Sequence, residues 1–218
     1  NSGLGNIVNP TTSLANEKVS GIPMLLLVGS RGEPGKNDEP QHKFMGEITE
    51  SLLNVLDIEY SVIGNELSSQ EIREKFAQAA QVLRDGRQYA FVLKKDFLQN
   101  EDMETYFNQY QLKREDAIAE IINTLDAEDI VVSTTGKISR EVYEQSNQIK
   151  GGHAQDFLTV GGMGHASMIA FGIALQKKDK RVYCLDGDGA ALMHMGGMAF
   201  IGKQKRLLFQ NSYIKFQV

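Results

Sequence analysis

The sequence predicts an α/β fold built from two units, each a parallel sheet flanked by helices. Two observations carry this prediction. Continuous apolar runs such as Ile22–Gly29 are bounded by glycine- and proline-rich loops, which is typical of strands buried in parallel sheets. Segments with helical periodicity lie between such runs, and this alternation of strand and helix favours parallel pairing.

In the first half, Ile22–Gly29 is expected to be a strand buried on both faces. The clearest helix follows Ser68, because Ser68 and Glu71 have capping-box spacing and Gly86 ends the segment. Its inward face is predicted to carry Ile72, Phe76, Ala79 and Leu83. The other elements expected here are a helix over Phe44–Leu56 and strands over Tyr60–Ile63 and Tyr89–Leu93.

The second half repeats the scheme after a polar stretch within residues 94–111. A helix is expected over Arg114–Leu125 and a buried helix over Ala166–Leu175, with strands over Asp129–Thr134, Phe157–Val160 and Arg181–Leu185. The tail KQKRLLFQNSYIKFQV, residues 203–218, is strand-like at its end. We therefore expect domains over 1–98 and 113–218, joined by a linker over 99–112.

The composition argues against large charged partners. The sequence has 23 basic and 28 acidic residues, a formal charge of −5, so nothing attracts nucleic acid or an anionic membrane in general. Cys184 is the single cysteine and cannot form an internal disulfide. No apolar run approaches the roughly 20 residues of a membrane span, and the start does not resemble a signal peptide. These features predict a cytoplasmic protein with a small-molecule partner.

The most informative turn is Gly187-Asp188-Gly189, which follows an apolar strand. Such a turn is ordinary loop chemistry by itself, since glycine accepts positive φ and aspartate caps helices. At the carboxyl end of a parallel strand, however, it lies where ligands bind, with a helix N-terminus beside it. A carboxylate next to a diphosphate needs a bridging cation, so Asp188 favours a Mg²⁺–diphosphate site.

A second glycine cluster, TVGGMGHAS at residues 159–167, also follows a predicted strand. As a dinucleotide fingerprint it is incomplete, because Ser167 stands where the final glycine or alanine belongs. No acidic residue follows a second strand at the required distance either. A Rossmann oxidoreductase is therefore the less favoured alternative.

Gly-Asp-Gly after an apolar strand, with Gly-Gly-Met-Gly some 25 residues before the aspartate, resembles the diphosphate-binding domain of thiamine diphosphate enzymes. The resemblance implies that Asp188 ligates Mg²⁺, that Met163 bends the cofactor and that the Gly161 carbonyl holds the aminopyrimidine. It also implies that the loop after the first strand of the domain contacts the diphosphate. The implied cofactor-binding residues are Thr135, Gly136, Gly161, Gly162, Met163, Gly187, Asp188, Gly189 and Ala190.

The segments NSGLGN, NPTTSL and GIPMLLLVGSRGEPGKNDEPQH narrow the resemblance to the phosphonopyruvate decarboxylases, with the sulfopyruvate decarboxylases as nearest relatives. The implied reaction is the decarboxylation of phosphonopyruvate to phosphonoacetaldehyde and CO₂, with thiamine diphosphate and Mg²⁺. The implied assembly is a homo-oligomer whose active sites are shared between subunits. In the loop after Ile22–Gly29, Arg31 and His42 are candidate phosphonate contacts, and the alternative is that they lie on a solvated loop.

Two parts of the implied site are not found in the sequence. The family's activating glutamate precedes the NSGLGN motif, so no catalytic residue is assigned, and the 218 residues are expected to turn over little or no substrate. The second Mg²⁺ ligand should be an Asn-Asn pair, but Asn211 is followed by Ser212, and the resemblance fades after about Lys205. The domains are thus expected to be truncated at both ends. An alternative of another class is an inactive module that only binds ligands or a partner.

The remaining histidines and methionines receive structural roles. His153, His165 and His194 lack the spacing of a zinc site, so packing or capping is expected, although His153 or His165 is placed to transfer a proton. Met193, Met195 and Met198 are expected to fill the core around the turn.

Overall fold

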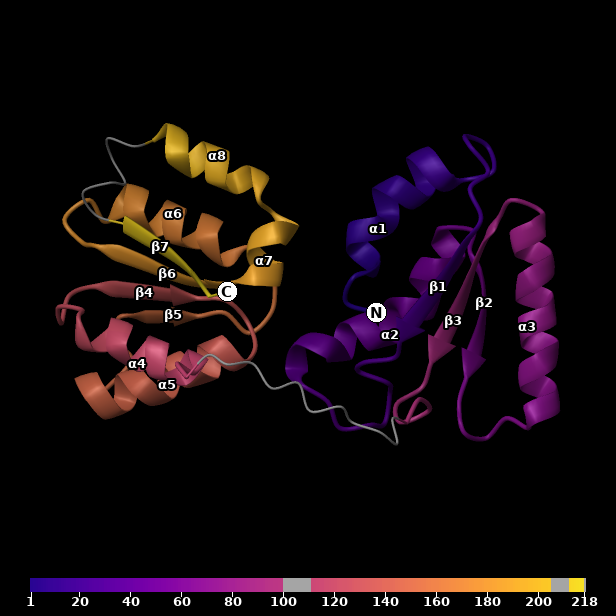
Figure 1. Cartoon of the computed structure of the whole chain (residues 1–218), viewed down its shortest axis with the longest axis horizontal. Helices are drawn as coiled ribbons and strands as arrows, with labels where there is room; N and C mark the ends of the chain where they lie inside the picture. Colours follow the sequence, from indigo (N-terminus) through magenta and orange to yellow (C-terminus); the bar gives the residue numbers. More distant parts are fainter. Residues whose placement is uncertain (100–110, 205–211, 218) are drawn as a thin grey trace. The chain divides into compact units, whose positions relative to one another are not determined.

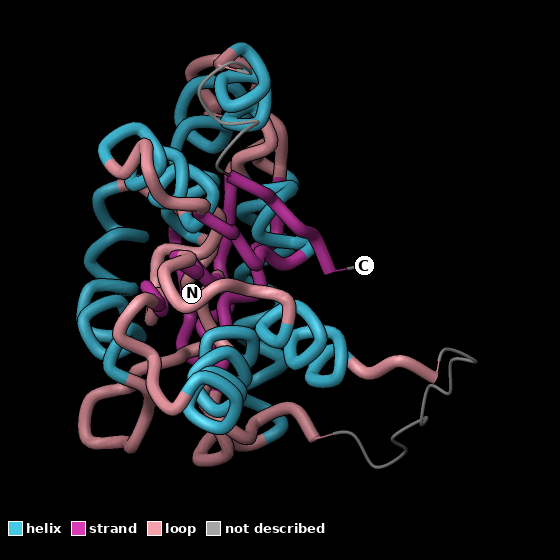
Figure 2. The backbone as a smooth tube through the Cα atoms, turned by 90° about the vertical axis from the view of Figure 1, so that its left-hand side faces the viewer, coloured by secondary structure: helices cyan, strands magenta, loops and turns pink. Residues whose placement is uncertain are grey.

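The computed structural model describes residues 1–99, 111–204 and, for the backbone, 212–217. It forms two compact units, Asn1–Thr105 and Tyr106–Val218. In both units helices flank a parallel sheet, as Figures 1 and 2 show, so the predicted α/β fold is confirmed. Most of the expected linker over 99–112, and Asn211, lie outside the described residues.

The first unit has a three-stranded parallel sheet in the order β1-β3-β2. The strands are β1 Met24–Gly29, β2 Glu59–Ile63 and β3 Gln88–Leu93. One face is covered by α1 Leu4–Pro10 and α2 Pro40–Val55, and the other by α3 Ser69–Arg84 (Figure 1). A π-helical turn, Thr11–Ala15, follows α1.

The predicted capping box at the start of α3 is confirmed. The Glu71 backbone N–H donates to Ser68 Oγ at 3.3 Å, and the Ser68 backbone N–H donates to Glu71 Oε2 at 2.8 Å. The Ser68 hydroxyl, which donates to Glu71 Oε2 at 2.7 Å, and then the Ser68 backbone N–H hold the pKa of the Glu71 carboxyl below its usual value. Two free N–H groups at the helix start are thereby satisfied.

The second unit has a four-stranded parallel sheet in the order β5-β4-β6-β7. The strands are β4 Ile130–Ser133, β5 Asp156–Leu158, β6 Val182–Gly187 and β7 Ser212–Gln217. Helices α4 Arg114–Asn123 and α5 Lys137–Lys150 cover one face, and α6 Ala166–Gln176 covers the other. Two short helices, α7 Asp188–Met193 and α8 Gly196–Lys203, lie on the α6 side (Figure 1).

Three expectations about burial were wrong. Leu25 and Leu27 of β1 are 43% and 66% exposed, because β1 is an edge strand and α3 does not fully cover that face. Phe76 is 53% exposed, although its ring lies 4.6 Å from that of Phe91. Helix α6 packs against β4 and β6 and also contacts α8, but Met168 on it is exposed.

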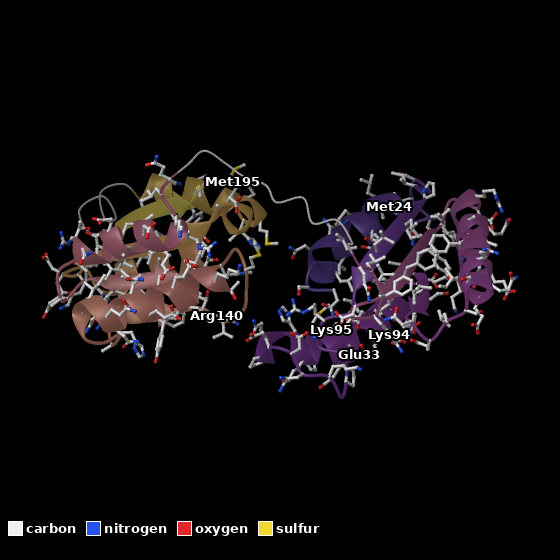
Figure 3. All side chains as sticks on the ribbon, turned by 60° about the horizontal axis from the view of Figure 1, so that its bottom comes forward. Met24, Glu33, Lys94, Lys95, Arg140 and Met195 are labelled. Carbon is white, nitrogen blue, oxygen red and sulfur yellow. The ribbon has the colours of Figure 1, made fainter. Side chains whose placement is uncertain are left out.

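Two of the three methionines expected in the core after the turn were also misassigned, whereas Met198 is partly buried. Met193 and Met195 are 44% and 59% exposed, and Met195 lies just before α8 at the surface of its unit (Figure 3). Met193 is the last residue of the six-residue helix α7, and Met195 lies in the turn that leads to α8. Cys184, in contrast, is buried in β6 as its apolar surroundings predict.

Candidate cofactor site

The site lies at the carboxyl end of the sheet in the second unit, where three loops leave neighbouring strands. Ser133 at the end of β4 pairs in register with both Leu158 of β5 and Leu185 of β6. The loops that follow these strands therefore begin side by side. In parallel α/β sheets this edge is where ligands bind.

A buried hydroxyl network joins the loops after β4 and β5. Ser139 Oγ lies 2.8 Å from Ser133 Oγ, 2.8 Å from the Thr134 carbonyl and 2.9 Å from the Thr159 carbonyl. Thr159 Oγ1 donates to the Ser133 carbonyl at 2.7 Å. All four side chains are buried, so the strand ends are held by bonds shielded from water.

The loop after β4 continues into the predicted diphosphate contact. Thr135 Oγ1 donates to the Val160 carbonyl at 2.5 Å, which ties this loop to the loop after β5. Gly136 has φ +92° and precedes α5, a conformation that favours glycine. The 14-residue helix α5 starts directly after it, so its N-terminal N–H groups lie at this loop.

The Gly187-Asp188-Gly189 turn joins β6 to α7. Asp188 is the first residue of α7 and is exposed, and its Oδ1 accepts from the Gly189 backbone N–H at 2.7 Å. Asp188 can therefore offer its second oxygen to a cation. Ala190 is buried at 1% exposure, so this candidate contributes backbone rather than side chain.

The second glycine cluster lies against this turn. A Cβ built on Gly189 would meet Met163 Cε at 3.2 Å, which places the Met163 side chain over the turn. Gly164 has φ +88°, and a Cβ there would lie 3.2 Å from the Ala190 carbonyl oxygen. The structure thus brings together both glycine clusters that were singled out from the sequence, and the contact at Gly164 requires glycine.

These residues fit a Mg²⁺–diphosphate group. Mg²⁺ binds through one or two carboxylates together with phosphate oxygens and water, so a single exposed aspartate is a sufficient protein anchor. Among the described residues no cluster of three or more His, Cys, Asp or Glu could hold a metal alone. At the same strand ends, Thr134 Oγ1 and Asp186 Oδ2 are buried without a hydrogen-bond partner among the described residues. These two oxygen atoms are therefore available for hydrogen bonds with a bound ligand.

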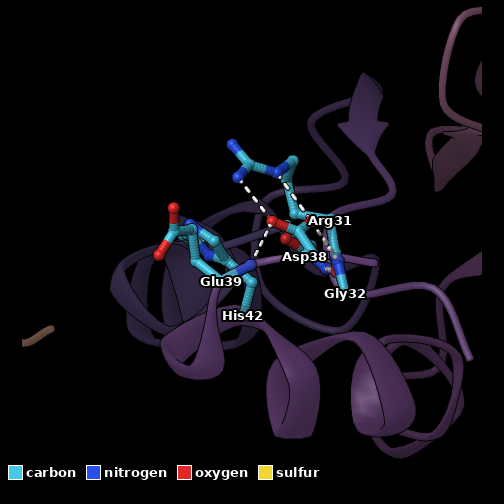
Figure 4. Close-up of polar contacts among 7 residues, drawn as sticks. Arg31, Gly32, Asp38, Glu39 and His42 are labelled. Carbon is cyan, nitrogen blue, oxygen red and sulfur yellow. Dashed lines mark hydrogen bonds and ion pairs between the residues drawn. The ribbon is translucent and has the colours of Figure 1, made fainter. Parts of the chain in front are cut away.

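The two candidate substrate contacts lie in the first unit. Arg31 forms a two-point ion pair with Asp38, with Nε 2.9 Å from Oδ2 and Nη2 2.7 Å from Oδ1 (Figure 4). Asp38 also accepts from the backbone N–H groups of Gly32 and Glu39, both at 2.8 Å. The guanidinium and these N–H groups hold the pKa of the Asp38 carboxyl well below its usual range. Arg31 is therefore already paired.

His42 lies in the first turn of α2, and its Nδ1 is 3.5 Å from Ser2 Oγ. A Cβ built on Gly32 would lie 1.9 Å from the His42 carbonyl oxygen, so the Arg31 loop packs directly on this helix turn. Arg31 and His42 thus belong to one local cluster in the first unit.

Comparison with known proteins identifies the second unit. The family model described as thiamine pyrophosphate enzyme, C-terminal TPP binding domain matches residues 134–214. The chain carries a thiamine pyrophosphate-binding domain. Thiamine pyrophosphate is another name for thiamine diphosphate. The match begins at Thr134 in the loop after β4, includes both glycine clusters and extends beyond Lys205, where the resemblance was expected to fade.

Curated relatives extend the similarity to the first unit. Phosphonopyruvate decarboxylase from Streptomyces viridochromogenes is 34% identical over 93% of this chain and 53% of its own length, and that from Streptomyces hygroscopicus is 33% identical over 92% and 52%. Sulfopyruvate decarboxylase subunit beta from Methanocaldococcus jannaschii is 38% identical over 41% of this chain and 45% of its own length. The predicted resemblance is confirmed, and the chain spans about half the length of the phosphonopyruvate decarboxylases that it matches.

Sequence reasoning missed the groups that hold the site together. Ser139 and Thr159 were not singled out, because serine and threonine side chains signal a network only when strand register is known. The proximity of His165 and His194 was not predicted either, and their ring centroids are 4.5 Å apart. Among the described residues, no helix combines the length and the apolar character needed to cross a membrane.

Proposed function

We propose that this chain belongs to a thiamine diphosphate- and Mg²⁺-dependent decarboxylase that converts phosphonopyruvate to phosphonoacetaldehyde and CO₂. The observation that carries the proposal is the convergence of three loops, after β4, β5 and β6, on one edge of a sheet whose sequence matches a cofactor-binding domain. The names of the most extensively aligned relatives supply the substrate.

Each part of the edge has a role toward the cofactor. Asp188 holds Mg²⁺, and the glycines around it let the diphosphate approach the backbone closely. Thr135 and Gly136 present the start of α5 to the same anion. Met163 and the Gly161 carbonyl position the remainder of the cofactor. When bound, thiamine diphosphate supplies the electron sink that lets a 2-keto acid lose CO₂.

The substrate carries a phosphonate close to the reacting carbon, and cationic side chains must neutralise it. We assign this neutralisation to Arg31 and His42, which both lie in the first unit, and Asp38 fixes the geometry of the Arg31 guanidinium. The protein functions as a homo-oligomer with shared active sites. The name of one relative, sulfopyruvate decarboxylase subunit beta, is consistent with assembly in this group of enzymes.

The test has two stages, run on the 218-residue protein. Calorimetric titration with thiamine diphosphate in the presence of Mg²⁺ comes first, and we expect saturable binding that EDTA abolishes. Phosphorus NMR with phosphonopyruvate then follows any formation of phosphonoacetaldehyde. Absence of Mg²⁺-dependent cofactor binding would overturn the proposal.

Two alternatives give different outcomes in the same experiment. Faster consumption of sulfopyruvate than of phosphonopyruvate would assign the chain to the sulfopyruvate decarboxylases, which align with the second unit. Cofactor binding without any turnover would fit both the decarboxylase and the alternative of another class, a module that binds the cofactor or a partner without catalysis, because the resemblance places the activating glutamate outside these 218 residues.

A further inference from the structure

A cavity of about 450 Å³ lies beside the Gly161–Gly164 cluster in the second unit. Its walls come from the start of α6, the end of α7 and the start of α8, and consist mainly of glycine and methionine. His165 and His194 are the ionisable side chains among the described residues that line it. The cavity is therefore apolar except for two imidazoles.

The orientation of His165 is fixed by its backbone. Its Nδ1 lies 3.0 Å from the Gly162 carbonyl oxygen and 3.3 Å from that of Met163. Because a carbonyl oxygen only accepts, Nδ1 must carry a proton and donate it. Nε2 is then the nitrogen left to interact with a ligand, and it becomes a second donor when the ring is protonated.

The position of His194 depends on Gly164. A Cβ built on Gly164 would lie 2.5 Å from His194 Nδ1, so the ring occupies space that only a glycine leaves open. The His194 carbonyl accepts from the Gly197 backbone N–H at 2.9 Å, which fixes the turn between α7 and α8. The ring centroid of His194 is 4.5 Å from that of His165.

Two protonated imidazoles this close repel one another unless an anion contacts both rings from the cavity. Helix α6, which starts at Ala166 without a side-chain cap, adds the positive end of its dipole at the same place. A phosphonate resembles a phosphate monoester, which carries about −1.5 to −2 charge at pH 7. A sulfonate carries a single charge and has no proton to share.

We propose that His165 and His194 form a dianion subsite that recognises the phosphonate group in preference to a sulfonate. This inference rests on the proposed function, because it names the group that would select between the two candidate substrates. It places one anion contact in the second unit itself, whereas Arg31 in the first unit is paired with Asp38. The methionine and leucine side chains of the lining supply no competing charge beside the two imidazoles.

The test measures binding of methylphosphonate and methanesulfonate to the 218-residue protein, by phosphorus NMR and by competition. The variants are His165→Gln, His194→Gln and the double substitution, and glutamine keeps a donor for the Gly162 carbonyl. His153→Gln is the matched control, because His153 stacks on Tyr143 away from the cavity lining. Each cavity substitution is expected to raise the Kd for methylphosphonate by about tenfold or more. The control should match the unsubstituted protein, and methanesulfonate should bind at least about tenfold more weakly.

An equal Kd for the unsubstituted protein and the double variant, or for the two anions, would overturn the subsite. Thiamine diphosphate titrations on the same variants separate this result from the proposed function. If the cofactor binds but methylphosphonate binding ignores the histidines, the subsite is wrong and the cofactor assignment remains. If methylphosphonate binding needs the histidines but the cofactor does not bind, the subsite remains and the decarboxylase proposal is wrong.

Discussion

Removal of the buried Ser139 hydroxyl should destabilise the carboxyl end of the sheet in the second unit, where the candidate cofactor site lies. Ser139 Oγ can donate its one proton to the Thr134 or the Thr159 carbonyl, and it accepts from Ser133 Oγ. Ser139→Ala leaves the Ser133 hydroxyl and the two carbonyls without this partner in a buried place. Ser146→Ala is the matched control, because Ser146 is also buried in α5 but its Oγ has no partner among the described residues.

The magnitudes follow from these contacts. Leaving a buried polar group unsatisfied costs about 1–3 kcal/mol. Alanine in place of serine returns roughly 0.5 kcal/mol in helix propensity at either position. We therefore expect Ser139→Ala to lower the free energy of unfolding by about 2 kcal/mol. Ser146→Ala should leave it unchanged or raise it by about 0.5 kcal/mol.

Hydrogen exchange followed by mass spectrometry measures this difference in the second unit alone. For Ser139→Ala, amides of β4 peptides should exchange about 30-fold faster, which corresponds to about 2 kcal/mol. Peptides of the first unit provide the internal reference. Equal exchange in the two variants would refute the reasoning, since it would mean that the network does not stabilise the strand ends.

Three further predictions follow. Gly164→Ala should destabilise the second unit by about 1–2 kcal/mol, because φ is +88° and the new Cβ would clash with His194 Nδ1. Gly172→Ala in α6 places its Cβ where no atom lies within 4 Å, so it should stabilise the unit by up to about 1 kcal/mol. Thermal unfolding of the two variants measures this difference. Burial raises the pKa of the Cys184 thiol to about 12, so this thiol should react with Ellman's reagent at pH 8 only when urea unfolds the protein. Fast labelling without urea would contradict the burial of Cys184. The Asp38 pKa is depressed, so its ion pair with Arg31 stabilises the fold at pH values above the ordinary aspartate pKa near 3.8, and this contribution is lost as the pH falls below 3.8. The difference in unfolding free energy between the unsubstituted protein and Asp38→Asn, measured by urea unfolding, should therefore shrink in acid. A difference that stays constant with pH would exclude the ion pair.

Local signals in the sequence predicted much of this molecule. Strand β6 and the turn after it were identified because an apolar run followed by Gly-Asp-Gly is a short-range pattern. Helix α3 was predicted from its capping box, whose two bonds span only three residues. The grouping of the loops after β4, β5 and β6 at one sheet edge could be predicted because parallel strands bring their carboxyl ends together.

Features that depend on long-range packing could not be predicted. Helix α5 was not identified, because its buried face consists of Ser139, Val142 and Ser146 rather than a stripe of large apolar residues. The exposure of Leu27 depends on β1 lying at a sheet edge. The pairing of Arg31 with Asp38 depends on how one loop folds back on α2, and composition does not encode this.

The most direct test of the account is thiamine diphosphate binding to Asp188→Asn, measured by calorimetry with Mg²⁺ and with EDTA. The matched control is Asp179→Asn, since Asp179 is exposed at the amino end of β6, opposite the cofactor edge. We expect the control to bind as the unsubstituted protein does, and Asp188→Asn to lose the Mg²⁺ dependence together with a factor of about ten or more in affinity. Equal, Mg²⁺-dependent binding by both variants would contradict the assignment of this edge as the cofactor site.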